Sequence, residues 1–154
     1  MKTDTRTIYV TESDKAKLED LFDYVSNVWK RDQRYLDALR QELERAEVVA
    51  AADIPPDVIT MNSQVRVRDL DSGDITVYTL VFPRDADFSR NRISILAPIG
   101  TALLGSRVRD IIEWKVPAGT RRLKVESVLY QPEAAEQESN SSGAHHRRSI
   151  YQAA

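Results

Sequence analysis

Apolar side chains recur at intervals of three and four residues along the first third of the chain, and this spacing places them on one face of an α-helix. One run comprises Leu18, Leu21, Phe22 and Val25, with Trp29 on the same face, and a second run comprises Leu36, Leu39, Leu43 and Ala46. Thr11 and Asp14 have the spacing of a capping box, which predicts that the first helix begins there. The pattern therefore predicts two amphipathic helical runs before residue 50.

The segment that joins the two runs leaves two arrangements open. Residues 26–33 contain neither Gly nor Pro, and the apolar seam continues across them with one interruption, where Asp32 would lie inside. One continuous helix of about 36 residues would need a partner chain to cover its apolar stripe, whereas two antiparallel helices would cover their own. The pattern alone favours neither arrangement.

Pro55 and Pro56 end the helical region, because proline cannot continue a helix and favours an extended conformation at the residue before it. Beyond them the apolar period changes to two, which predicts strands. The expected strands are 65–68, 75–82, 93–97, 111–116 and 123–129, the last bulged near Ser127, and one short helix is expected over 98–105, closed by Gly105. This segment is therefore expected to be an α+β module with a mostly antiparallel sheet.

Three units follow from the pattern: a helical unit over 1–54, the sheet module over 55–132, and a tail over 133–154. The tail is rich in Glu, Gln, Ser, Ala and Asn. Such a segment buries too little apolar surface to offset the conformational entropy lost on ordering, so disorder is expected over 135–154.

Composition and charge narrow the classes of function. The chain has 154 residues, 42% apolar and 30% charged, which indicates one domain or a domain with a small accessory. The net charge of −2 divides into −3 for 1–54, +2 for 55–132 and −1 for 133–154, so no segment has the strong positive charge that phosphate-backbone binding requires. No apolar run approaches the roughly 18–20 residues that cross a bilayer, and no signal peptide is recognised. With no cysteine in the chain, the cytosol is the simplest compartment.

Residues that usually carry catalysis are scarce. The chain has no Gly-x-Gly-x-x-Gly sequence and no phosphate-binding loop, and its two histidines, His145 and His146, lie in the tail. A Ser-His-Asp triad is thus excluded from the folded part, and no enzyme, cofactor or metal site is predicted. Asp69, Asp71 and Asp74 are expected to be turn residues. The alternative is a fragment of a calcium-binding loop, but its downstream ligands and flanking helices are missing.

Three segments offer contacts for a partner. Residues 29–32 lie between the helical runs, where Trp29 is either a core anchor or a contact residue. Residues 97–100 form a proline-led apolar segment directly after a strand and either pack or bind. The third set surrounds the polar 83–92 loop, where solvation is the ordinary state of such charges, and comprises Arg84, Arg90 and Arg92.

Four stretches of the sheet module are specific enough to identify a family. They are 57–63, 97–105, 114–119 and 130–135. Together they closely resemble the bacterial Rnk-type regulators of nucleoside diphosphate kinase, which share their carboxy-terminal domain with the Gre transcript-cleavage factors. The resemblance spans about residues 8–135 and is weaker in the helical part, where it rests mainly on 38–46.

The resemblance implies a short amino-terminal antiparallel coiled-coil hairpin followed by an FKBP-like antiparallel β-sheet domain with one short helix, and it thereby favours two helices over one. It also implies binding to RNA polymerase near the secondary channel, with the sheet domain docked on the channel rim and the hairpin tip in the channel mouth. The docking residues implied are Arg90, Arg92, Ser94, Pro98, Ile99 and Leu103, and the tip residues are Trp29, Lys30, Arg31 and Asp32.

The hairpin departs from the Gre pattern. Gre factors carry a pair of acidic tip residues that hold a catalytic magnesium ion, whereas Asp32 is a single acid beside Lys30 and Arg31. Two helices of about 12–16 residues also reach only about 20 Å. The expected protein is therefore a monomeric, non-enzymatic regulator that competes with Gre factors without stimulating transcript cleavage and influences nucleoside diphosphate kinase.

Association with DNA is expected only indirectly, without sequence-specific contact, and neither a cofactor nor a membrane partner is expected. The alternative functions are a peptidyl-prolyl isomerase of the FKBP type and a helix-mediated dimeric scaffold. Arg109 is a further departure from the family, because relatives more often have Gly between Val108 and Asp110. It is expected to alter a turn and to leave docking intact.

Overall fold

The computed structural model describes residues 7–28 and 34–141. The helices are α1 (Glu12–Val28), α2 (Arg34–Glu44), α3 (Pro98–Leu103) and α4 (Pro132–Ser141), and the 3₁₀ turns are η1 (Ala51–Asp53), η2 (Pro83–Asp85) and η3 (Phe88–Arg90). The strands are β1 (Tyr9–Val10), β2 (Glu47–Val48), β3 (Gln64–Asp69), β4 (Ile75–Val81), β5 (Arg92–Ser94), β6 (Ile111–Val116) and β7 (Gly119–Tyr130). The α+β class predicted from the sequence is confirmed.

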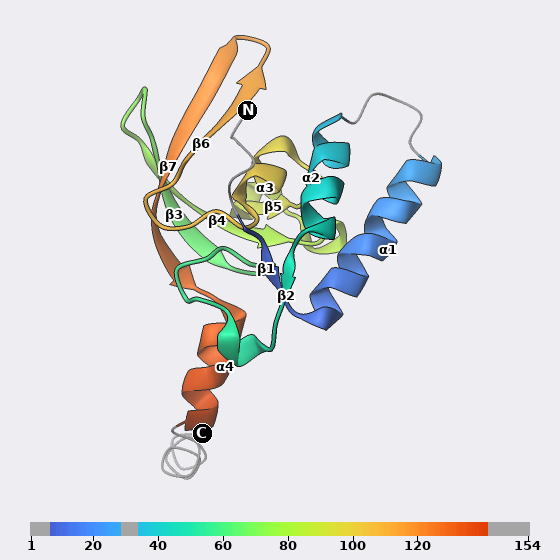
Figure 1. The fold of residues 1–154 in the computed structure, drawn as a ribbon. Helices are drawn as coiled ribbons and strands as arrows, with labels where there is room; N and C mark the ends of the chain where they lie inside the picture. Colours follow the sequence, from blue (N-terminus) through green and yellow to red (C-terminus); the bar gives the residue numbers. More distant parts are fainter. Residues whose placement is uncertain (1–6, 29–33, 142–154) are drawn as a thin grey trace.

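The amino-terminal unit contains two helices, and α1 and α2 run in roughly opposite directions (Figure 1). The backbone N–H of Asp14 donates to Thr11 Oγ1 at 3.2 Å, which confirms the predicted helix start. Arg40 on α2 pairs with Asp23 on α1 and donates to Ser26 Oγ at 2.8 Å. The predicted apolar faces meet in the core, where the buried residues are Leu18, Phe22, Val25, Leu36, Leu39 and Leu43.

Two very short strands close the base of this helical pair. β1 and β2 are parallel, with Glu47 N–H donating to the Ile8 carbonyl at 2.8 Å and Val49 N–H donating to the Val10 carbonyl at 3.0 Å. The sequence pattern does not predict them, since two residues are too few to show a period. The pairing joins the chain that precedes α1 to the chain that follows α2.

The five-stranded sheet has the order β5-β4-β3-β7-β6. Its neighbours are antiparallel except β4 and β5, which are parallel. The register of β3 and β7 shifts in two places, and one shift lies beside Ser127, where a bulge was predicted. The strand predicted over 93–97 ends at Ser94 because the chain turns there, with Ala97 N–H donating to the Ser94 carbonyl at 3.0 Å.

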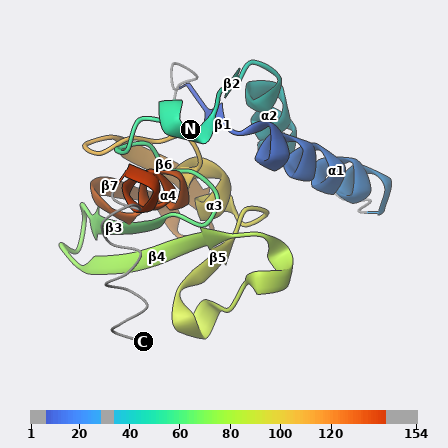
Figure 2. The same cartoon turned by 90° about the horizontal axis from the view of Figure 1, so that it is seen from below.

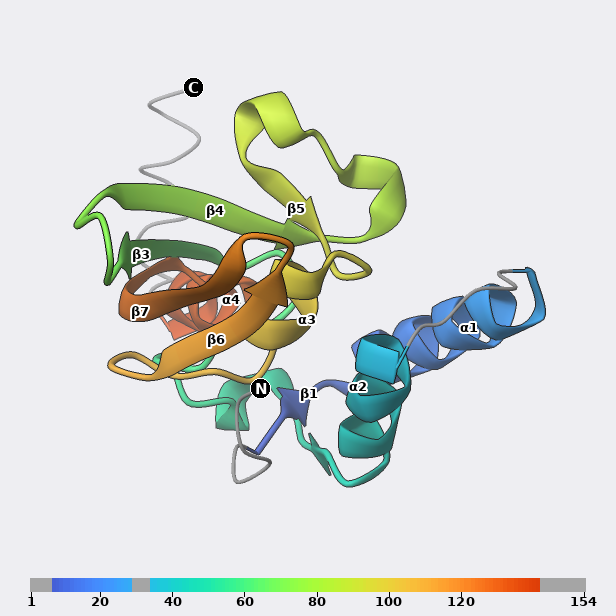
Figure 3. The same cartoon turned by 90° about the horizontal axis from the view of Figure 1, so that it is seen from above.

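Helix α3 lies against the sheet and contacts both edge strands, β5 and β6, so the sheet curls around it (Figure 3). Gly100 makes this close packing possible, since a Cβ atom there would lie 2.1 Å from the Ser94 carbonyl oxygen. Gly105 follows the helix with φ +83°, a conformation that glycine adopts without strain. The predicted helix closed by Gly105 is confirmed.

One continuous core connects the helical unit to the sheet module. Buried residues of α1 and α2 belong to the same cluster as those of β3, α3 and β7. Ile8 lies directly against Gly105, where a Cβ atom would be 2.7 Å from Ile8 Cγ1. The predicted boundary at residue 54 therefore separates two units of sequence that share their apolar interior.

Helix α4 corrects the prediction of disorder for residues 135–141. Gln131, just before the helix, donates from Nε2 to the carbonyls of Pro55 at 2.8 Å and Val58 at 2.7 Å. Glu133 in the first turn accepts a hydrogen bond from Thr60 Oγ1 at 2.7 Å. These contacts fix the helix beside η1, and Figure 2 shows it end-on next to the sheet. Within the described residues, no helix has both the length and the apolar composition that crossing a bilayer requires.

Candidate functional site

Residues 94–99 form a fixed turn that leads into α3. Ser94 Oγ accepts from Leu96 N–H at 3.0 Å, and Thr101 Oγ1 donates to the Pro98 carbonyl at 2.9 Å. Pro98, at the first helical position, is exposed, and Ile99 is half-buried. These hydrogen bonds and the close approach of Gly100 to Ser94 define the backbone beneath them, so Pro98 and Ile99 present a preformed apolar surface.

Leu103 does not belong to this surface. Its side chain is fully buried in the core, because the end of α3 is enclosed by the curled sheet and by α2. The expectation that Leu103 contacts a partner directly is therefore corrected, and its role is to hold α3 in place. Ser94, Pro98 and Ile99 lie within the turn that leads into α3, and their role in docking stays a prediction.

The 83–92 loop is well structured. The Asp87 carboxylate caps η3 by accepting from Ser89 Oγ at 2.6 Å and from Ser89 N–H at 3.1 Å, and the hydrogen bond from the Ser89 hydroxyl is the main cause that lowers the pKa of Asp87. Asp87 and Arg92 exchange two backbone hydrogen bonds of 2.9 and 3.0 Å. Asn91 adopts a left-handed conformation with φ 57°. The loop therefore holds its side chains in defined positions.

This loop carries an aromatic residue that the sequence pattern did not single out. Phe88 is 82% exposed, and Arg90 beside it is also exposed, with its Nε 3.7 Å from the Asp87 carboxylate. Arg92 donates from Nε to the Asp85 carbonyl at 2.9 Å. A lone aromatic side chain within a polar stretch was the available signal. Exposed aromatic and arginine side chains are enriched at the centres of protein interfaces.

A cavity of about 560 Å³ opens between α1 and the start of this loop. Its lining residues are Lys17, Leu21, Asn62, Phe82, Pro83, Arg84 and Asp85. Phe82 is the single aromatic residue among them, so the cavity lacks the aromatic lining expected for a peptidyl-prolyl isomerase.

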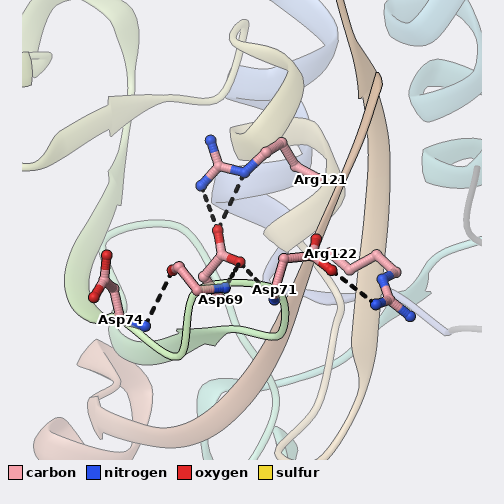
Figure 4. Close-up of polar contacts among 6 residues, drawn as sticks. Asp69, Asp71, Asp74, Arg121 and Arg122 are labelled. Atoms are coloured by element: carbon pink, nitrogen blue, oxygen red, sulfur yellow. Dashed lines mark hydrogen bonds and ion pairs between the residues drawn. The ribbon is translucent and has the colours of Figure 1, made fainter. Parts of the chain in front are cut away.

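The aspartates between β3 and β4 confirm the turn interpretation. Asp69 Oδ1 accepts from the backbone N–H groups of Asp71 at 2.8 Å and Ser72 at 3.1 Å, while Oδ2 accepts from Arg121 Nη2 at 2.6 Å. Figure 4 shows Asp69 between Asp71 and Arg121. Arg122 Nη2 donates to Asp71 at 2.9 Å. The backbone hydrogen bonds from Ser72 and Asp71, followed by the one from Arg121, lower the pKa of Asp69.

The carboxylates of Asp69 and Asp71 are thus occupied by backbone and guanidinium donors. Across residues 7–28 and 34–141, no three His, Cys, Asp or Glu side chains are grouped so that they could hold a metal ion. The predicted tip residues Trp29, Lys30, Arg31 and Asp32, and the two tail histidines, lie outside the described residues.

Arg109 occupies a position that suits glycine. Its φ is +83°, and its backbone N–H donates to the Val125 carbonyl at 2.7 Å, which ties the turn before β6 to β7. An L-residue pays a steric cost in this conformation. Arg109 is therefore a strained residue in this turn, and its effect on the turn relative to glycine stays a prediction.

Two family descriptions match the chain. "Transcription elongation factor, GreA/GreB, C-term" matches residues 54–130, and "Rnk N-terminus" matches residues 6–49. The two matches meet close to the predicted boundary at Pro55. The chain therefore belongs to the family of proteins that carry the GreA/GreB carboxy-terminal domain.

Comparison with individual proteins identifies this chain as a member of the Rnk type within that family. A regulator of nucleoside diphosphate kinase from Escherichia coli is 47% identical over 100 residues, which are 64% of this chain and 74% of that protein. The transcription elongation factor GreA from Rhodospirillum rubrum is 36% identical over 102 residues, 64% of this chain and 65% of that protein. A solved structure described as a prokaryotic transcription elongation factor GreA/GreB from Nitrosomonas europaea has a TM-score of 0.68 at 42% identity and covers 80% of this chain and 98% of that one. These relatives are named as regulators and transcription factors, and the Rnk-type resemblance is confirmed.

Proposed function

We propose that this chain is a non-enzymatic regulator that binds RNA polymerase near the secondary channel and influences nucleoside diphosphate kinase levels. Its family supports this proposal, since relatives with the same carboxy-terminal domain are transcription elongation factors and a relative with 47% identity is a regulator of nucleoside diphosphate kinase. The site of action is then the bacterial cytoplasm.

The surface formed by Pro98 and Ile99 is the proposed docking site on the channel rim, and the single observation that carries the proposal is the hydrogen-bonded turn that presents it. A preformed apolar surface loses little conformational entropy on binding. Arg90 and Phe88 on the 83–92 loop add a cation and an exposed aromatic ring. Arginine at the border of an interface speeds association with an acidic partner and selects its orientation.

The helical pair is proposed to occupy the channel mouth and to exclude Gre factors from it. The 17 residues of α1 correspond to a length of about 25 Å. A helical pair of this length is proposed to occupy the mouth without reaching a distant catalytic centre. Asp32 remains the one predicted acid at the tip, so competition without transcript cleavage is the expected behaviour.

Co-purification with core RNA polymerase tests this function. Pro98→Asp is expected to abolish retention while the fold is kept, because aspartate is favourable in the first turn of a helix. Pro117→Asp, at an exposed proline in the turn between β6 and β7, is the matched control and is expected to bind as the wild type does. Equal retention of all three proteins would refute the docking site, and no retention of the wild type would refute the function.

A transcript-cleavage assay on backtracked polymerase tests the second part of the proposal. The chain alone is expected to leave the RNA intact and to slow cleavage by added GreA in proportion to its concentration. Stimulated cleavage by the chain itself would contradict a non-enzymatic role. The isomerase alternative receives no support from the relatives or from the cavity beside Phe82, and light scattering separates the proposed monomer from a dimeric scaffold.

A further inference from the structure

The sheet has one face that the helices of the amino-terminal unit and α3 leave uncovered. Along β3 the side chains of Val65 and Val67 are buried, so Gln64, Arg66 and Arg68 point to the opposite side. Residues paired across strands share a face. The register therefore places their partners on this outer face, namely Ile75, Val77 and Thr79 of β4 and Lys124, Ser127 and Tyr130 of β7. Arg92 of β5 pairs with Thr79, and Ile111 of β6 pairs with Lys124, so both also lie on this face.

The outer face carries an excess of cations. Its positive residues are Arg66, Arg68, Arg92, Arg122 and Lys124, and its described acids are Glu113, Glu126 and Asp71, of which Glu126 pairs with Arg68 and Asp71 with Arg122. The cations gather on this face although the net charge of the whole chain is −2. A concentrated charge of one sign on one face steers oppositely charged partners toward it.

The centre of this face retains free positive charge. Arg68 donates to Glu126 at 2.7 Å, and this hydrogen bond is the main cause that lowers the pKa of Glu126, with the charges of Arg68, Lys124 and Arg66 adding to it. One carboxylate is thus surrounded by three cations. Within the described residues, neither Arg66 nor Lys124 forms an ion pair of its own.

Apolar side chains border the cations. Ile75 on β4 and Ile111 on β6 are 50% and 47% exposed, and they lie at the two ends of the row that contains Arg68 and Lys124. Such exposed β-branched residues on an otherwise polar sheet face are typical of an interaction surface.

The far end of the same face is hollowed. A recess of about 410 Å³ is lined by Asn62, Gln64, Thr79, Arg92 and Tyr130. Amide, hydroxyl and guanidinium donors converge there, a combination that suits a carboxylate. The recess therefore offers the donors that an acidic side chain needs, with Arg92 as the cation among them.

We propose that this outer face binds an acidic, amphipathic segment of a partner protein, with carboxylates over Arg66 and Lys124, apolar side chains on Ile75 and Ile111, and one acidic side chain in the recess. The surface is distinct from the one formed by Pro98 and Ile99, which lies at the start of α3. The two surfaces share no residue that this proposal tests, so each can fail separately.

A protein segment fits this face better than a nucleic acid does. Proteins that bind single strands stack successive bases on several aromatic rings, whereas Tyr130 is the one aromatic residue that the described register places on the outer face. A phosphate backbone has no counterpart for the exposed apolar side chains of Ile75 and Ile111.

NMR titration of the full chain tests the proposal with three probes: a synthetic helical peptide of glutamate and leucine, the same peptide with lysine in place of glutamate, and oligodeoxythymidylate. We expect the glutamate peptide alone to shift resonances of the outer face, with an affinity that falls as salt rises. Arg66→Glu and Lys124→Glu are each expected to weaken this binding about tenfold. The matched control is Arg45→Glu, which reverses an exposed charge at the end of α2 and is expected to bind as the wild type does.

Each other outcome overturns the proposal. Absence of binding by the glutamate peptide, shifts confined to other elements, or equal weakening by Arg45→Glu would show that the face is an ordinary solvated sheet surface. Tighter binding of oligodeoxythymidylate to the same residues would assign the face to nucleic acid instead. Circular dichroism of each variant verifies that the fold is kept, and none of these readouts depends on RNA polymerase.

Discussion

Replacing Arg109 by glycine is expected to stabilise the protein. Arg109 has φ +83°, an exposed side chain, and no side-chain hydrogen bond or ion pair with other described residues. An L-residue in the left-handed region costs about 1–2 kcal/mol. Glycine removes this cost but loses about 0.5–1 kcal/mol more backbone entropy on folding. The net gain in the free energy of unfolding is then roughly 0.5–1 kcal/mol.

Urea unfolding followed by circular dichroism measures this gain. With a slope of about 2 kcal/mol per molar urea, the midpoint is expected to rise by roughly 0.4 M at an unchanged slope. The melting temperature should rise by about 2 °C for a chain of this size. Arg109→Ala is the matched control, because alanine removes the side chain and keeps the strained backbone, so its stability should stay close to that of the wild type.

The reasoning would be refuted by either of two results. If Arg109→Gly is no more stable than the wild type, the positive φ carries no strain at this position. If Arg109→Ala gains as much as Arg109→Gly, the arginine side chain rather than the backbone causes the effect. The backbone hydrogen bond from residue 109 to the Val125 carbonyl is kept in all three proteins, so it does not contribute to the difference.

Three further predictions concern packing and titration. Gly105→Ala should lower the free energy of unfolding by about 2–3 kcal/mol, because it adds backbone strain and places a Cβ atom 2.7 Å from Ile8 Cγ1. Gly73→Ala is the control, since Gly73 has a similar φ but open space around it, and it should lower the free energy of unfolding by about 1 kcal/mol or less. Equal losses in urea unfolding would disprove the contact with Ile8. Burial raises the pKa of Glu133, so its contribution to stability is full at acid pH and is lost as pH rises through the folded-state pKa. The stability of Glu133→Gln relative to the wild type should therefore increase as pH rises above the ordinary glutamate pKa, and a difference that stays constant with pH would contradict this. The pKa of Asp69 is lowered, so its contribution to the free energy of unfolding is present above the unfolded-state pKa and is lost as pH falls through the folded-state pKa. Asp69→Asn should therefore be less stable than the wild type at neutral pH, and this difference in stability should shrink on acidification. A difference that persists below the folded-state pKa would contradict the prediction.

The local features of the fold were predictable where a period or a turn residue determines them. The three- and four-residue spacing from Leu18 to Val25 and from Leu36 to Leu43 predicts both helices, because each run covers one face of a helix. The strand from Ile111 to Val116 follows from alternating apolar and polar residues. The helix before Gly105 follows from an apolar segment that ends at a glycine, which adopts a positive φ there. The resemblance decided between one helix and two, which the period alone could not.

Features that depend on long-range contacts were beyond the pattern. Helix α4 is held by Gln131 and Glu133, whose partners Val58 and Thr60 lie 73 residues earlier in the chain. Leu103 was expected at a docking surface, but exposure cannot be inferred for a helix that is enclosed on several sides. The cationic outer face of the sheet could not be predicted from the sequence either, because its cations come from β3, β5 and β7 and are brought together only by the pairing of these strands.

The contact of Ile8 with Gly105 has a mechanical consequence. It fastens the strand that precedes α1 to the loop that follows α3, and the core continues from the helical pair into the sheet without a break. Packing at residue 105 therefore couples the position of the helical pair to that of the sheet module. A substitution there that disturbs this packing would change the orientation of the helices relative to the sheet.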